Sequence, residues 1–175
     1  MDDGIIEEWF MNYEKDITSY LVYYTGTSDV EDLVQDTFVI ALHKLKSFQH
    51  KSHPKTWLLT IARHLVIARH RKKKVWERVK RYLTPDQSTK NELEERSIKN
   101  MENLQLYEAI QRLPSRHRDV IILRGILELT PIEASDVLKC SANKVNVQFH
   151  RALKKLQLIL EMEGYNHEKS ANYSG

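Results

Sequence analysis

The sequence predicts an all-α protein of two small helical domains joined by a flexible linker, the C-terminal one containing a helix-turn-helix. Apolar residues recur at three- and four-residue steps along most of the chain, and no stretch alternates apolar and polar residues at strand spacing. The 175 residues include only five glycines. A polar segment that contains Pro85 separates two such helical regions.

Changes in composition set the predicted boundaries. The first domain is expected to cover residues 1–81, the linker 82–101 and the second domain 102–163. The polar tail, 164–175, is expected to be disordered.

In the first domain, a helix is predicted to follow the turn-like TGTSD, with Ser28 or Asp29 as its N-cap. Three- and four-residue steps place one set inward: Val30, Leu33, Val34, Phe38, Ala41 and Leu45. Pro54 ends the following loop, SFQHKSHP. The next helix starts with KTWLLTIARHLVIARHRKKK and continues into VWERVKR, with a predicted buried stripe of Trp57, Leu58, Ile61, Leu65 and Ala68.

The second domain is predicted to begin with two helices, one ending before Pro114 and one formed by SRHRDVIILRGI. Thr130, Pro131 and Glu133 form the pattern of a capping box with proline at the first helical position. The short helix from there ends at Leu138, and Ser141 can cap a longer one. A short helix, a tight turn and a longer helix are typical of a helix-turn-helix. The longer helix is predicted to turn Val145, Phe149, Ala152, Leu153 and Leu156 inward.

Charge is distributed in blocks of alternating sign. Residues 1–42 carry ten acids and one base, whereas residues 43–81 carry thirteen Lys or Arg and one acid. Residues 82–110 are acidic again, and 111–160 are basic. This pattern indicates partners of both signs.

Several classes of function are excluded by what the sequence lacks. Its one cysteine, Cys140, allows no intramolecular disulfide and no zinc site of paired thiolates. No metal site and no cofactor are expected. The sequence has no Gly-rich phosphate loop or nucleophile motif, so we expect no enzyme and no small-molecule substrate. The acidic N-terminus and the absence of a long apolar run predict a cytoplasmic protein.

Three motifs in order resemble the sigma-70 family of bacterial sigma factors, in particular the small extracytoplasmic-function (ECF) type. They are DVEDLVQDTF (29–38), KTWLLTIARHLVIARHRKKK (55–74), and LPSRHRDVIILR (113–124) followed by the helix-turn-helix and HRALKKL. The family often has Asn at the position of His64, Asp at that of Ala68 and glycine at that of Lys139. These departures leave the promoter sequence undefined.

The resemblance implies that the protein binds core RNA polymerase, through its beta-prime and beta subunits, and promoter DNA. The residues implied to contact the polymerase are Asp32, Leu33, Gln35, Asp36 and Phe38. Phe38 also falls on the apolar face, so the sequence pattern alone allows it to be either a polymerase contact or a residue of the hydrophobic core.

The second motif and the loop before it are implied to recognise the −10 element and hold the melted strand. Cations interspersed with aromatic residues suit phosphate contacts and base stacking. The residues concerned are Phe48, His50, Lys51, Ser52, His53, Lys55, Trp57, Thr60, Arg63, His64, Arg71 and Lys72. Trp57 is favoured as a core anchor over a stacking residue.

The helix-turn-helix is implied to recognise the −35 element with the first turns of its second helix in the major groove. Asn and Gln side chains can recognise adenine, and Lys or Arg guanine. Arg116 and Arg118, beside a helix start, suit contacts with backbone phosphates. The other implied residues are Ser141, Asn143, Lys144, Asn146, Val147, Gln148, His150 and Arg151.

The resemblance further implies an alternative sigma factor that acts in a stress or envelope response. It implies an anti-sigma factor, membrane-anchored, which would hold the protein at the membrane. Two other hypotheses are a free-standing dimeric helix-turn-helix regulator and a membrane-surface helix at 55–74. The acidic helix disfavours the first, and the clustering of charge at one end of the segment disfavours the second.

Overall fold

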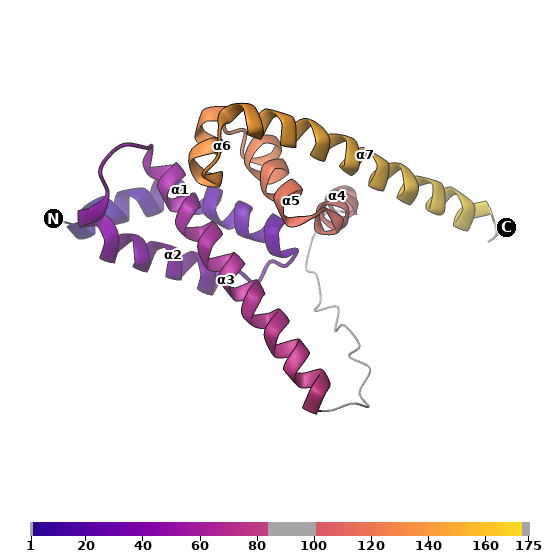
Figure 1. Ribbon diagram of the computed structural model, residues 1–175, viewed down its shortest axis with the longest axis horizontal. Coiled ribbons are helices and arrows are strands. Elements are labelled where there is room, and N and C mark those ends of the chain that lie inside the picture. Colours follow the sequence, from indigo (N-terminus) through magenta and orange to yellow (C-terminus); the bar gives the residue numbers. More distant parts are fainter. Residues whose placement is uncertain (1, 84–100, 173–175) are drawn as a thin grey trace. The chain divides into compact units, whose positions relative to one another are not determined.

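A computed structural model describes residues 2–83 and 101–172, which contain helices and no β-strand (Figure 1). The all-α prediction is therefore confirmed for this part of the chain. The chain forms two compact units, one of Met1–Leu21 with Thr27–Ser97 and one of Val22–Gly26 with Ile98–Gly175. Of the predicted linker, positions 84–100 lie outside the described residues, since the flanking helices end at Leu83 and begin at Met101.

The first unit is built on two complete helices, the part of a third up to Leu21, and one short 3-10 turn. They are α1 (Asp2–Thr25), α2 (Glu31–Lys44), η1 (Leu45–Ser47) and α3 (Pro54–Leu83). α2 packs against α3, and Ile17, Tyr20 and Leu21 of α1 are fully buried. α1 was not predicted as an element from the sequence, although its buried residues recur at helical spacing.

The inward face predicted for α2 is confirmed from Val30 to Ala41, whereas Leu45 is only partly buried. Its predicted cap was wrong. The N-cap residue is Val30, which makes no side-chain cap, and Asp29 instead donates its N–H to the hydroxyl of Thr27 at 3.2 Å. α2 therefore begins without the side-chain acceptor that an aspartate cap would give.

The predicted buried stripe of α3 was correct at Leu58 and Ile61 and wrong at its other three positions. The buried apolar residues are Leu58, Leu59, Ile61, Ala62 and Val66, whereas Trp57 and Leu65 are partly exposed and Ala68 is exposed. Apolar residues surround the first turns of α3, so periodicity alone allowed two registers. Packing against α2 selects the face that contains Leu58, Ala62 and Val66.

The second unit contains α4 (Met101–Arg112), α5 (Ser115–Ile121), a π-helical turn η2 (Ile122–Ile126), α6 (Pro131–Leu138) and α7 (Ala142–Asn172). α4, α5 and α6 all pack against α7. Two predictions for α7 were wrong. Leu153 is 43% exposed instead of buried, and the helix continues to Asn172 through the tail that was predicted to be disordered. Positions 173–175 lie outside the described residues.

The start of α6 has the predicted capping box. The N–H of Glu133 donates to the Thr130 hydroxyl at 3.2 Å, and the N–H of Thr130 donates to the Glu133 carboxylate at 2.7 Å. These two hydrogen bonds satisfy backbone N–H groups that would have no partner at the start of a helix. Pro131, at the first helical position, has no N–H group to satisfy. The predicted Ser141 cap of α7 also forms, accepting from the N–H of Lys144 at 3.2 Å.

Lys139 ends α6 in the left-handed conformation, with φ 53° and ψ 48°. A side chain with a Cβ is strained there by about 1 kcal/mol, and glycine is not. We expect Lys139→Gly to raise the free energy of unfolding by about 0.5–1 kcal/mol, measured by thermal or urea denaturation. Lys154→Gly, in the exposed middle of α7, is the control and should lower it by about 1 kcal/mol. A loss of stability in both variants would contradict the conformational argument.

Candidate nucleic-acid and partner interfaces

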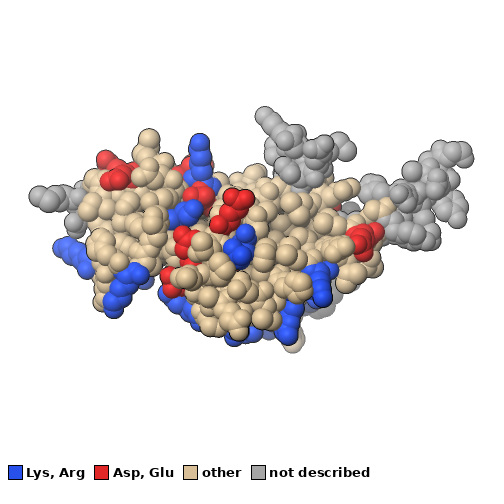
Figure 2. All heavy atoms as spheres, turned by 90° about the horizontal axis from the view of Figure 1, so that it is seen from above, with Lys and Arg blue, Asp and Glu red and all other residues tan. Residues whose placement is uncertain are grey.

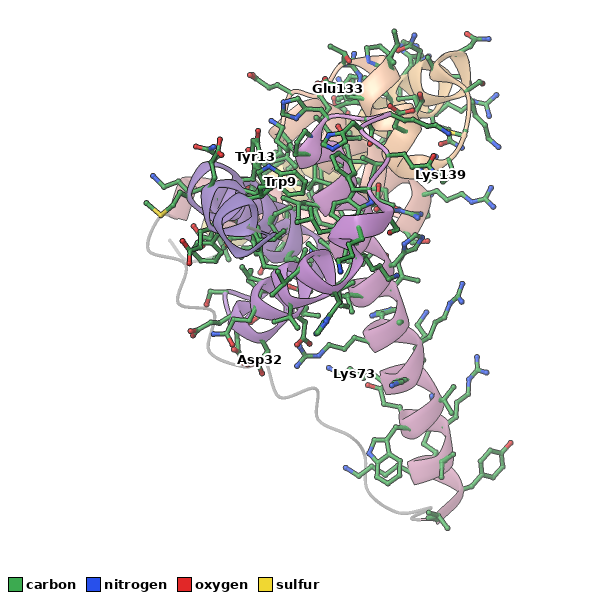
Figure 3. All side chains as sticks on the ribbon, turned by 90° about the vertical axis from the view of Figure 1, so that its left-hand side faces the viewer. Trp9, Tyr13, Asp32, Lys73, Glu133 and Lys139 are labelled. Carbon is green, nitrogen blue, oxygen red and sulfur yellow. The ribbon has the colours of Figure 1, made fainter. Side chains whose placement is uncertain are left out.

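The exposed face of α2 is acidic. Asp32, Gln35 and Asp36 are exposed, as predicted, and the amide of Gln35 donates to Glu31 at 3.3 Å (Asp32 is labelled in Figure 3). Leu33 and Phe38 are only 4% and 6% exposed, which corrects their prediction as contact residues. The ring of Phe10 from α1 packs edge-on over Phe38 with centroids 4.9 Å apart. The members of the predicted set that a partner can reach are therefore polar or acidic, and Val39, 51% exposed, is an apolar neighbour on the same helix.

The loop between η1 and α3 presents polar side chains over an aromatic base. His50, Lys51 and His53 are exposed, and Ser52 is partly exposed. Phe48 is only 8% exposed, which corrects its prediction as a stacking residue. Its ring packs against Trp9 at 5.2 Å, His50 at 4.6 Å and Trp57 at 4.8 Å. Trp57, which the sequence favoured as an anchor, packs in this cluster and is partly exposed.

The middle of α3 places the residues predicted for base recognition on one side of the helix. Thr60 lies three residues before Arg63 and four before His64, so the three side chains share one side of α3. Thr60 is partly buried, and its hydroxyl donates to the carbonyl of Thr56 at 2.9 Å. Arg63 and Lys55 are partly exposed, whereas His64 is exposed. These side chains form one polar face beside the loop.

The second half of α3 is exposed at every residue from Ala68 to Leu83. It carries Arg71, Lys72 and the neighbouring Lys73 and Lys74, whose ammonium groups extend into solvent (Lys73 is labelled in Figure 3). Solvated cations in a row on a helix suit contacts with phosphates, and they add little sequence information. On the face shown in Figure 2, acidic and basic side chains are both present, as expected for a protein with partners of both signs.

The first turns of α7 are exposed, as a recognition helix requires. Gln148 is partly exposed; the others are exposed, namely Ser141, Asn143, Lys144, Asn146, Val147, His150 and Arg151. Arg116 is also exposed. Arg118 is different, because its guanidinium donates to the carbonyls of Ile110, Gln111 and Leu113 at 3.3, 2.6 and 3.3 Å. Its prediction as a phosphate contact is corrected, since it caps the end of α4.

Arg124 supports the helix-turn-helix, a role that was not predicted from the sequence. Its guanidinium lies over the ring of Phe149 at 5.2 Å, and it donates to the carbonyl of Leu129, directly before the capping box. It therefore connects η2 both to α7 and to the start of α6. No spacing rule identifies such a residue, because the π-helical turn sets its direction.

His117 of α5 lies near two cations of α7, Lys155 and Arg151. Burial lowers the pKa of His117, and the positive charges of Lys155 and Arg151 lower it further. The Nδ1 atom of His117 is buried and has no hydrogen-bond partner. A neutral imidazole is favoured beside these cations, which leaves the neighbouring side chains of α7 as the charged groups of this surface.

Residues 2–83 and 101–172 contain no group of three or more His, Cys, Asp or Glu side chains that could hold a metal ion. None of the helices described is long and apolar enough to cross a membrane.

Comparison with known proteins agrees with this geometry. Residues 9–84 match the model of sigma-70 region 2, and residues 103–156 that of sigma-70 region 4. RNA polymerase sigma factor YlaC of Bacillus subtilis is 34% identical over 87% of this chain and 90% of its own length. ECF RNA polymerase sigma factor SigX of the same species is 31% identical over 86% and 80%.

Two solved structures share the fold. The sigma factor RpoE of Bartonella quintana, solved with the anti-sigma factor NepR, has a TM-score of 0.72 and 22% identity over 92% of this chain and 98% of that one. CnrH, solved with the cytosolic domain of CnrY, has a TM-score of 0.70 and 23% identity over 91% and 90%.

A chain with these two regions is a promoter-recognition subunit, the class of protein that binds both core RNA polymerase and promoter DNA. The chain belongs to the sigma-70 family, and within it is an alternative RNA polymerase sigma factor of the ECF type. Proteins of this class regulate the initiation of transcription.

Proposed function

We propose that the two units divide the work of promoter recognition between them. In this proposal, 1–81 docks on the polymerase and recognises and opens the −10 element, and 102–163 binds the −35 element. The observation that carries it is the arrangement within the first unit, where the acidic face of α2 and the cationic half of α3 belong to neighbouring helices. The acidic face of α2 is complementary to a positively charged surface of the polymerase, and the cationic half of α3 is complementary to DNA phosphates.

We propose Asp32, Gln35 and Asp36 as the polymerase contacts, because they are the exposed members of the predicted set. In the second unit, Asn143, Lys144, Asn146 and Gln148 are proposed to contact base edges, with Arg116 and Arg151 on phosphates.

For the −10 element, the loop side chains His50, Lys51, Ser52 and His53 are proposed to hold the separated strand, and Thr60, Arg63 and His64 to discriminate bases. Holding bases outside the stack offsets the free energy of unstacking, a few kcal/mol per base. The protein would supply specificity and strand separation in the cytoplasm, while the polymerase supplies the chemistry of RNA synthesis. It would therefore itself be no enzyme.

The regulation of this chain is proposed from its relatives. The sigma factor RpoE of the same fold was solved bound to the anti-sigma factor NepR, and CnrH was solved bound to the cytosolic domain of CnrY. We propose that a membrane-anchored anti-sigma factor holds this chain until a stress or envelope signal releases it.

The test is initiation by a reconstituted holoenzyme on genomic DNA fragments, with start sites mapped on the RNA. We expect start sites that need both this chain and core polymerase. A chain that binds duplex DNA as a dimer and directs no initiation would instead be the free-standing helix-turn-helix regulator.

Replacing Lys72, Lys73 and Lys74 together with alanine should weaken binding to all promoter sequences about equally. For every phosphate that the variant no longer neutralises, the slope of log affinity against log salt should become less steep by about 0.9 on duplex DNA. The measurement is a salt titration of holoenzyme binding to two promoters of different sequence. A change in the preference between the two promoters would contradict the assignment of these lysines to phosphates.

A further inference from the structure

One face of α1 contacts the loop 48–53 at two points and the start of α3 at a third. Trp9, Tyr13 and Asp16 are three or four residues apart, so they lie on one side of the helix (Trp9 and Tyr13 are labelled in Figure 3). We propose that this face is a brace that holds the loop 48–53 and the start of α3 in the conformation that captures the separated DNA strand. The inference rests on the proposed role of that loop.

The first point of the brace is aromatic and buried. Trp9, which is 7% exposed, packs edge-on against Phe48 at 5.2 Å and against Trp57 at 5.9 Å. Phe48 in turn contacts the ring of His50 at 4.6 Å. The position of a proposed strand contact, His50, therefore depends on a ring supplied by α1.

The other two points lie one turn and two turns further along α1. The ring of Tyr13 packs edge-on against His53 with centroids 5.7 Å apart, and the carboxylate of Asp16 lies 3.5 Å from the ammonium of Lys55. His53 also accepts, through Nδ1, the N–H of Lys55 at 3.2 Å. The order of contacts along α1 thus follows the order along the later segment, from Phe48 and His53 in the loop to Lys55 in α3.

The backbone of the loop supports a preorganised conformation. His50 has φ 52°, in the left-handed region that residues other than glycine rarely adopt. Such a conformation persists where neighbouring groups hold the residue in place. Here the ring of Phe48 packs against His50, and Trp9 packs against Phe48. A loop that is already ordered loses less conformational entropy when it binds a strand, so its affinity is higher.

The brace is tested with a single-stranded oligonucleotide of the non-template −10 sequence from a promoter found in the initiation assay. We expect Tyr13→Leu and Asp16→Asn to lower the affinity of the holoenzyme for it by about twofold to fivefold each. Amide hydrogen exchange at 48–53 should become faster. Tyr13→Phe, which keeps the ring, should match the parent protein, and so should Asn12→Ala on an exposed side of α1.

A double-mutant cycle separates a brace from general support of the fold. In a chain that already carries His53→Ala, adding Tyr13→Leu should change strand affinity no further, because the two rings can no longer meet. An equal loss in both backgrounds, or a parallel loss of affinity for core polymerase, would overturn the brace.

Failure of the brace and failure of the proposed function give different results. If His50→Ala with Lys51→Ala leaves strand affinity unchanged, the loop does not hold the strand, and the inference falls with that role. If this pair lowers the affinity while Tyr13→Leu and Asp16→Asn do not, the loop keeps its role and the brace alone is overturned.

Discussion

Asp36→Arg is expected to weaken the binding of this sigma factor to core RNA polymerase by roughly ten- to a hundredfold. Asp36 is exposed on the acidic face of α2 and has Asp32 one helical turn before it. Reversing its charge would place a cation against a partner surface that we propose to be positive. Because the side chain is exposed, the fold of the first unit should tolerate the change.

The measurement is a binding titration of the chain against purified core polymerase. Glu161→Arg on α7, also exposed, makes the same change in net charge and should leave core affinity unaltered. Binding of the Asp36→Arg chain to −35 duplex DNA should equal that of the parent. An unchanged core affinity would remove α2 from the interface, and equal losses in both assays would indicate misfolding.

Leu123→Ala is expected to lower the free energy of unfolding of the second unit by about 3 kcal/mol. Leu123 lies in η2 and is fully buried, in the core that α5 and η2 form with α7. Truncation removes its apolar packing and leaves a cavity that the surrounding helices fill only in part. Since α7 carries the proposed recognition residues, the Leu123→Ala chain should lose binding to the −35 element at a lower temperature than the parent protein does.

Urea denaturation of the full chain, followed by amide hydrogen exchange in α5 and α7, measures this effect. Leu158→Ala is the matched control, because Leu158 is 59% exposed and its truncation should change stability by less than about 0.5 kcal/mol. Equal effects of the two truncations would contradict the core assignment of Leu123. Core polymerase binding at low temperature should be the same in both variants.

Features that depend on neighbours in the chain were predictable from the sequence. The inward face of α2 from Val30 to Ala41, the capping box at Thr130, and the Ser141 cap follow from helical spacing and from local hydrogen bonds. The first family motif lies on α2, and the two caps lie in the helix-turn-helix that belongs to the third. Hence the fold class and the region 2 and region 4 identities needed no tertiary information.

Features that depend on contacts with residues distant in the sequence were not predictable. The predicted buried stripe of α3 was wrong at Trp57, Leu65 and Ala68, because packing against α2 selects between two apolar faces that the period allows. Arg118 was predicted to contact a phosphate. Its guanidinium instead donates hydrogen bonds to carbonyls at the end of α4 that have no partner within the helix. Spacing cannot distinguish an arginine that faces DNA from one that caps a helix.

The sequence by itself determined that this chain is a two-region sigma factor, because helical period, capping and motif order are local properties of the chain. Only the tertiary structure decided which members of each motif remain at the surface. It buried Phe48 and exposed Ala68, because apolar side chains are removed from water only where other elements pack against them. It also brought Trp9, Tyr13 and Asp16 to a loop some forty residues later in the chain, a relation that no local pattern encodes.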